Sequence, residues 1–189
     1  MIEAVLKREV IVNKTSCCAL GVSIFVILTS LGAFVRIHLP FTPVPLTLQT
    51  LFVLLSGLFL GNHLGAITQI SYVILGISGL PIFAGAGSGL NYLLGPTGGY
   101  LFGFVLAAFF VGKFIKHAKD NLFSVLSVLF IGDLIILICG ILWLKFLLGY
   151  SSVKLLSIGL IPFIPGDLLK AVFAASLYLK LKTRLKEIF

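Results

Sequence analysis

The sequence predicts an all-α integral membrane protein with six transmembrane helices, built as a single domain over residues 1–189. The chain is 59% hydrophobic and only 11% charged, whereas about a quarter of a typical soluble domain is charged. Its mean hydropathy is +1.19, and its apolar residues form separate stretches of membrane-spanning length. A soluble protein would need a charged surface that this composition does not provide.

Six stretches qualify as spans, since a span takes about 20 predominantly apolar residues. They are residues 16–35, 46–60, 64–80, 98–115, 123–146 and 166–181. A further apolar stretch, 153–164, is short, and Pro162 and Pro165 interrupt it. We expect it to be a partial or re-entrant segment that leads into the last span.

The Lys and Arg residues divide unequally between the two sides of the predicted bundle. The richer side carries Lys7, Arg8, Lys14, Lys113, Lys116, Lys119, Lys180, Lys182, Arg184 and Lys186. The other side carries only Arg36, Lys145 and Lys154. Because positive segments stay in the cytoplasm, we expect about 14 N-terminal and about 8 C-terminal residues there. The net charge of +8 then reflects anchoring to the lipid bilayer and not nucleic-acid binding.

Two loops on the less basic side have unusual compositions. Residues 36–49 contain three prolines within six positions, which keeps this segment extended. Residues 81–97 are uncharged and rich in glycine, and glycine lets a backbone approach a ligand closely. The glycine-rich loop is either a flexible connection or a lid over an outward-facing pocket.

Glycines also recur at four-residue spacing within the predicted spans. Gly57, Gly61 and Gly65 form one series, and Gly99 and Gly103 form another. Small residues at this spacing are the usual device for close helix packing in membranes, so we expect packing to be their role. Thr97, which precedes the second series, is expected to cap the fourth span.

Asp167 and Lys170 are the most informative residues of the last span. They are three residues apart, so they lie on one face of a helix, and charged groups at membrane depth are rare and usually functional. The helix dipole favours Asp167 in the first turn but disfavours Lys170 there. The pair is therefore either an internal ion pair that stabilises the fold or a polar cluster that faces a ligand. Asp133, the other intramembrane carboxylate, is expected to partner Lys170 or a hydroxyl group.

The sequence offers little support for catalysis. It has no Gly-x-x-x-x-Gly-Lys-[Ser/Thr] motif, so we expect no P-loop for ATP. An intramembrane serine protease would use Ser88 with a base, but only His38 lies on the same predicted side, without an orienting partner. Cys17, Cys18 and Cys139 have neither zinc nor disulfide spacing. We expect a protein that is not an enzyme and that holds no metal or cofactor.

Several motifs in order resemble those of the BioY family. Residues 40–57 read PFTPVPLTLQTLFVLLSG, residues 79–85 read GLPIFAG, and residues 94–101 read LGPTGGYL. The resemblance is dense over residues 20–112 and returns in the last span, where residues 165–170 read PGDLLK.

The BioY resemblance implies a fold, a substrate and partners. BioY proteins are biotin-binding S components of energy-coupling factor (ECF) transporters in the bacterial cytoplasmic membrane, with an S-component fold. Their partners are a transmembrane coupling subunit and two cytoplasmic ATPase subunits, which alone use ATP. The family's Asp and Lys correspond to Asp167 and Lys170, and its pocket loop contributes Asn91. The family's Ala-x-x-x-Ala docking surface on the first helix is missing, which leaves Gly21, Ser23 and Ser30 as its small residues.

Biotin carries a ureido ring, an apolar thioether ring and a valerate carboxylate. Asp167 is expected to accept from the ureido N–H groups in charge-assisted hydrogen bonds. Lys170 would meet the ureido oxygen, the valerate or Asp167 itself. The other expected pocket residues are aromatic walls and neutral polar groups, namely Tyr72, Phe83, Tyr100, Gln49 and Asn91.

A self-contained secondary transporter for biotin or another small vitamin is the alternative function. Such transporters place their sites between repeated halves with broken helices, and the sequence shows no duplicated pair of Gly/Pro-broken segments.

Overall fold

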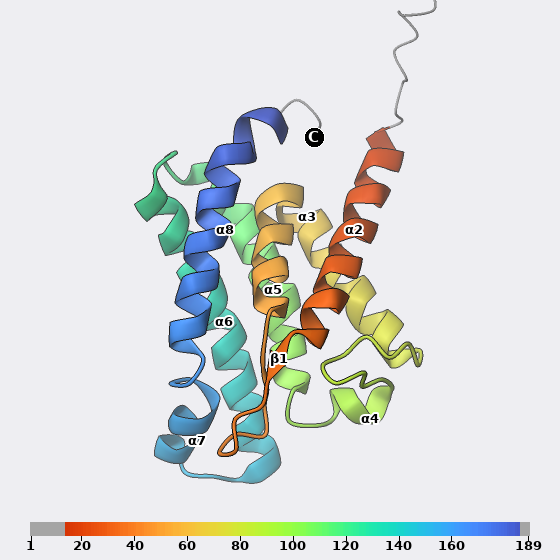
Figure 1. The fold of residues 1–189 in the computed structure, drawn as a ribbon, viewed down its shortest axis with the longest axis vertical. Helices are drawn as coiled ribbons and strands as arrows, with labels where there is room; N and C mark the ends of the chain where they lie inside the picture. The colour runs from red at the N-terminus through yellow and green to blue at the C-terminus, as the bar shows by residue number, and fades with distance from the viewer. Residues whose placement is uncertain (1–13, 186–189) are drawn as a thin grey trace, which may run out of the picture.

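The computed structural model describes residues 14–185, and these form a bundle of helices (Figure 1). The helices are α2 (Lys14–Phe34), α3 (Gln49–Ile77), α4 (Leu90–Leu93), α5 (Gly98–Phe114), η1 (Ile115–His117), α6 (Leu122–Leu148), α7 (Ser152–Gly159) and α8 (Ile164–Leu185). Two short antiparallel strands, β1 (Arg36–Ile37) and β2 (Leu46–Thr47), pair between α2 and α3. The all-α prediction is confirmed, apart from this pair of strands.

Four of the described helices, α2, α3, α5 and α6, are long and apolar enough to cross a membrane. The pair α7 and α8 qualifies as a fifth candidate span, bent by 47° at its break. Pro162 lies in the break, where a helix cannot keep its regular hydrogen bonds. The short segment that we predicted before the last span is thus α7, and α8 begins two residues earlier than expected.

Helix α3 doubles back on itself at Gly61. Gly61 has φ +81° and ψ −174°, a backbone conformation that only glycine adopts readily. Across this turn, Gln49 Nε2 donates to Tyr72 Oη at 2.6 Å and Gln69 Nε2 donates to Ser56 Oγ at 3.0 Å. In a straight helix, positions 49 and 72 would be roughly 35 Å apart. The two halves of α3 are therefore antiparallel neighbours, and they correspond to the predicted spans 46–60 and 64–80.

Of the predicted packing glycines, Gly57, Gly65, Gly99 and Gly103 pack helices closely, whereas Gly61 forms the turn of α3 and an added Cβ there would meet nothing within 4 Å. A Cβ on Gly65 would lie 3.1 Å from Gly57 Cα in the other half of α3, and a Cβ on Gly57 would lie 2.6 Å from the Ala108 carbonyl oxygen of α5. Similarly, a Cβ on Gly103 would lie 2.8 Å from Ile136 Cα of α6. These positions leave no space for a side chain, so the bundle closes around α5.

The predicted basic segments meet at one end of the molecule. The start of α2, the end of α8 and η1 lie near that end in Figure 1, whereas β1, α4 and α7 lie toward the other end. Lys182 of α8 forms an ion pair with Asp120, which follows η1. Lys7, Arg8 and Lys186, which entered the same prediction, lie outside the described residues.

The buried core has two parts. One part, toward the basic end, includes Leu54, Val111, Leu129 and Ala174. The other part combines aliphatic side chains with the aromatic residues Tyr72, Phe83, Tyr100, Phe104 and Phe163. The candidate site lies in this second part.

The packing of Gly57 predicts a stability difference between two identical substitutions. Gly57→Ala would place a methyl group against the backbone of α5, and such overpacking costs roughly 1–3 kcal/mol. Gly166→Ala is the matched control, because a Cβ there meets nothing within 4 Å. Thermal unfolding of the purified protein in detergent should show a lower midpoint for Gly57→Ala alone. Equal midpoints would contradict the close approach of α3 and α5.

Candidate substrate-binding site

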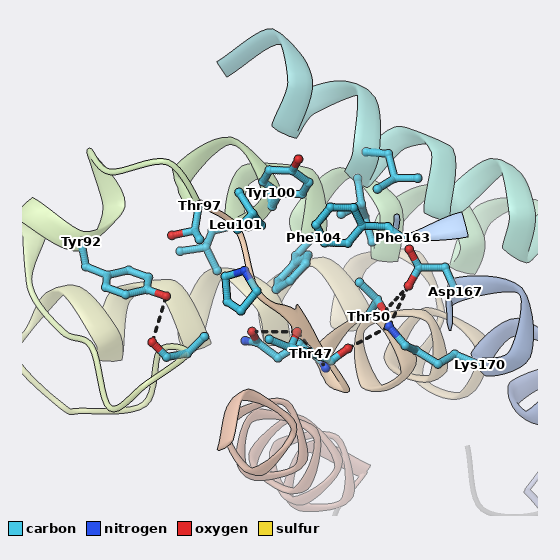
Figure 2. Close-up of a pocket in the computed structure, with 16 residues that line it drawn as sticks. Thr47, Thr50, Tyr92, Thr97, Tyr100, Leu101, Phe104, Phe163, Asp167 and Lys170 are labelled. Atoms are coloured by element: carbon cyan, nitrogen blue, oxygen red, sulfur yellow. Dashed lines mark hydrogen bonds and ion pairs between the residues drawn. The ribbon is translucent and has the colours of Figure 1, made fainter. Parts of the chain in front are cut away.

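A pocket opens among the loop-side ends of the helices, between the first half of α3, α5, α6 and α8 (Figure 2). The space between its lining atoms is about 510 Å³, a volume that includes open solvent at its mouth. Its lining residues are Val44, Pro45, Thr47, Gln49, Thr50, Ala84, Tyr92, Thr97, Tyr100, Leu101, Phe104, Ile136, Leu137, Phe163, Asp167 and Lys170. Half of these side chains are apolar, and polar groups gather at two ends of the pocket.

The charged end is built around Lys170. Its Nζ donates to Asp167 Oδ1 at 2.7 Å, to Thr50 Oγ1 at 2.8 Å and to the Thr47 carbonyl oxygen at 2.8 Å. Thr50 Oγ1 in turn donates to Asp167 Oδ1 at 3.1 Å. An ammonium group has three donors, so the protein itself uses all the donors of Lys170.

Residues far apart in the sequence form this end of the pocket. Asp167 lies in the first turn of α8, and Lys170 follows on the same face. Thr47 ends β2, and Thr50 lies in the first turn of α3, more than a hundred positions earlier. The junction of β2 and α3 is held in place because Leu48 N donates to the carbonyl oxygens of Gly32 and Val35 at the end of α2. The pocket therefore depends on α2, α3 and α8 meeting at one point.

The buried carboxylates leave unused acceptors at the charged end. Asp133 on α6 is 5% exposed and lies close enough to Asp167 for the two carboxyl groups to interact. Among residues 14–185, neither Asp167 Oδ2 nor Asp133 Oδ1 has a hydrogen-bond partner. Buried acceptors without donors are costly. This end of the pocket therefore suits a group that donates hydrogen bonds.

The middle of the pocket is apolar and aromatic. Tyr100, Leu101, Phe104 and Phe163 lie between the two polar ends in Figure 2. The Tyr100 hydroxyl donates to the Gly159 carbonyl oxygen at 2.9 Å, so this tyrosine offers the pocket its ring, which lies 6.0 Å from that of Phe163. Such walls suit a flat apolar group.

The second polar end, formed by Tyr92 and Thr97, lies under the glycine-rich loop. The Tyr92 hydroxyl donates to the Ala84 carbonyl oxygen at 3.1 Å, which ties α4 to this loop. Burial raises the pKa of the Tyr92 hydroxyl, and the nearby charge of Arg36 opposes this rise. Thr97 immediately precedes α5, as predicted, but its side chain makes no capping hydrogen bond. Both side chains instead face the pocket.

The structure brings four of the seven predicted site residues to the pocket wall: Gln49, Tyr100, Asp167 and Lys170. Tyr72 and Phe83 are fully buried behind the wall. There the Tyr72 hydroxyl accepts a hydrogen bond from the Gln49 side chain. Phe83 packs edge-on against Tyr72 and stacks on Tyr92. Asn91 lines a neighbouring hollow at the mouth.

Sequence reasoning missed Thr47, Thr50, Tyr92 and Phe163. A lysine in the first turn of a helix needs hydrogen-bond acceptors. Thr47 and Thr50, which follow the proline run at a spacing of three, are the signal in the sequence that could have identified the partners of Lys170. Nothing in the sequence marks Tyr92 or Phe163, since their place in the wall depends on the fold of α4 and on the break before α8. Among residues 14–185, no group of three His, Cys, Asp or Glu side chains lies close enough to hold a metal ion.

Comparison with known proteins decides the family. A sequence model of the BioY family matches residues 9–187. The chain belongs to the BioY family. The "Probable biotin transporter BioY" of Pyrococcus horikoshii is 42% identical over 153 residues, which cover 81% of this chain and 88% of that protein. The "Biotin transporter BioY" of Thermotoga maritima is 42% identical over 159 residues, which cover 84% of this chain and 92% of that protein.

A solved structure supports the BioY assignment at the level of the fold. The crystal structure of the S-component for biotin from an ECF-type ABC transporter matches with a TM-score of 0.85 at 27% identity. The match covers 90% of this chain and 93% of that one. The BioY match extends well beyond the motifs in residues 20–112 and reaches through α8.

Proposed function

We propose that this chain binds biotin and serves as the substrate-specific subunit of an ECF transporter. The observation that carries the proposal is the Asp167–Lys170 cluster, which lies at one end of a pocket with an aromatic middle. Relatives named as biotin transporters and a structural neighbour described as the S-component for biotin support the same conclusion.

Biotin matches the chemistry of this pocket. Its ureido N–H groups donate to the carboxylate of Asp167, whose Oδ2 has no donor among residues 14–185. Hydrogen bonds to a charged group are stronger than neutral ones. The fused ring then lies against Tyr100, Phe104 and Phe163, and Gln49 adds a neutral polar contact.

The chain crosses the membrane six times in this proposal. Helices α2, α5 and α6 supply three passes, the two halves of α3 supply two, and α7 with α8 supplies the last. The hydrogen bonds across the Gly61 turn support counting α3 twice, and an even number of passes agrees with both termini in the cytoplasm. The basic end of the bundle then faces the cytoplasm, and the pocket opens outward.

The sequence contains no P-loop motif, so in this proposal the energy for transport comes from partner subunits. We propose a transmembrane coupling subunit and two cytoplasmic ATPases, with the glycine-rich loop acting as a lid that admits biotin. Of the three small residues expected to form the docking surface on α2, Gly21 and Ser30 are buried and Ser23 is exposed, as is Ala19 four positions before it. A docking surface on α2 therefore combines Ala19 and Ser23 with large apolar side chains such as Leu20 and Ile27.

Binding of biotin by the purified protein should be tight without nucleotide and should depend on the charged cluster. Asp167→Asn should weaken binding by about 10- to 150-fold, because a hydrogen bond to a charged group is worth roughly 1.5–3 kcal/mol. Lys170→Ala should also weaken binding, because Lys170 holds Asp167 and Thr50 in place. Isothermal titration measures the affinity, and Lys154→Ala, an exposed cation at the same end of the bundle, is the control. If both variants bind normally but unfold at lower temperature, the cluster is only a structural ion pair.

Uptake in cells distinguishes the two classes of transporter. Cells that express this chain with a coupling subunit and its ATPases should accumulate labelled biotin, and an inactive ATPase should abolish accumulation. The chain expressed without any coupling module should give much lower uptake. Uptake that is independent of the module and driven by an ion gradient would instead support a secondary transporter.

Cysteine labelling tests the orientation. Ser88→Cys and Lys116→Cys, both at exposed positions, are placed singly in a background that lacks Cys17, Cys18 and Cys139. A membrane-impermeant maleimide should label Ser88→Cys in intact cells, with protection by biotin, because the glycine-rich loop faces outward. Lys116→Cys should react only after the membrane is opened. Labelling of Lys116→Cys in intact cells would reverse the assigned orientation.

A further inference from the structure

A second hollow joins the mouth of the pocket. It shares Pro45, Ala84, Tyr92 and Thr97 with the pocket itself. Its remaining lining residues are Arg36, His38, Pro43, Asn91, Gly95 and Pro96. We call this hollow the vestibule. It lies next to the Tyr92 and Thr97 end of the pocket, away from the Asp167–Lys170 cluster.

Arg36 is held in the vestibule by the backbone. It lies on β1 directly opposite Thr47 of β2, and the Thr47 carbonyl oxygen binds Lys170, so the strand pair links the two ends of the site. The guanidinium lies over Gly85, where a Cβ would come within 2.9 Å of Arg36 Cζ. Gly85 also has φ +80°. A glycine at this position therefore leaves room for the Arg36 side chain beside the loop.

Arg36 has no acidic partner in the part of the chain that the structure describes. The acidic residues among 14–185 are Asp120, Asp133 and Asp167, and the described ion pairs use Asp120 and Asp167 with other cations. Asp120 lies near the basic end of the bundle, and Asp133 interacts with the Asp167–Lys170 cluster. An unpaired guanidinium beside a pocket offers a forked donor to an anion.

The two ends of the site therefore favour different ligand groups: hydrogen-bond donors at the inner end and an anion at the mouth. At the inner end, Lys170 has already used its three donors, so an anionic group would find no free donor there and would lie beside the carboxylate of Asp167. At the mouth, Arg36 offers free donors and a positive charge. A ligand with N–H donors at one end and a carboxylate at the other fits the site in one direction only.

We propose that Arg36 binds the carboxylate of the substrate, with the ureido ring inside against Asp167 and the carboxylate outward in the vestibule. This inference rests on the proposed function, because it assumes that biotin occupies the pocket. Arg36 is then a specificity-determining residue that distinguishes the free acid from neutral derivatives. The positive vestibule also attracts the anion before it enters.

Two ligands and two matched variants test the role of Arg36. Biotin is compared with biotinamide, in which an uncharged amide replaces the carboxylate. The wild-type protein should prefer biotin, and Arg36→Gln should lower the affinity for biotin about 5- to 30-fold, since the contact is partly exposed. The affinity of Arg36→Gln for biotinamide should differ from the wild-type value by less than about twofold, which also shows that the variant is folded. Arg36→Lys should keep part of the preference for the acid.

The controls separate this inference from the proposed function. Lys154→Gln makes the same charge change at the same end of the bundle but does not line the site, and it should leave both affinities unchanged. Asp167→Asn should weaken both ligands alike, because both carry the ureido ring. The role of Arg36 would be overturned if the wild-type protein bound biotin and biotinamide with equal affinity. It would also be overturned if Arg36→Gln lost affinity for both ligands equally. In either case the binding of biotin itself would still be supported. A wild-type protein that binds neither ligand would overturn the proposed function.

Discussion

The contact of Lys170 with Asp167, Thr50 and Thr47 is the interaction on which the site depends. It joins the first turn of α8 to the strand pair and to the first turn of α3, and these segments lie more than a hundred residues apart. A buried charge without partners costs several kcal/mol, so these three segments must arrive together. The cluster thus stabilises the bundle and at the same time shapes the inner end of the pocket.

Close backbone contacts position the elements that this cluster joins. The turn at Gly61 folds α3 into two antiparallel halves, and Gly57, Gly65 and Gly103 let the neighbouring helices approach without side chains between them. Gln49 and Tyr72 then bond across the two halves, which fixes the pocket wall from behind. The strand pair connects this region to the mouth, because Arg36 of β1 pairs with Thr47 of β2.

The distribution of charge gives the pocket a direction. The Asp167 carboxylate lies inside, aromatic side chains lie in the middle, and Arg36, which has no acidic partner among residues 14–185, lies at the mouth. A ligand that donates hydrogen bonds at one end and carries a carboxylate at the other is complementary to this order. Because the three donors of Lys170 are all used within the protein, its role is to hold Asp167 and the two threonines in place.

The sequence by itself determined the membrane class, the glycine packing, the short segment before the last span, and Asp167 and Lys170 as the pair to examine. These features are local: they depend on hydropathy over about 20 residues or on spacing within one helical turn. The motifs of residues 40–57, 79–85 and 94–101 also indicated the family. Only the tertiary structure decided that Tyr72 and Phe83 lie behind the pocket, that Thr47 and Thr50 bind Lys170, and that Arg36 stands at the mouth. Those positions follow from contacts between segments far apart in the chain, and such contacts leave no periodic pattern in the sequence.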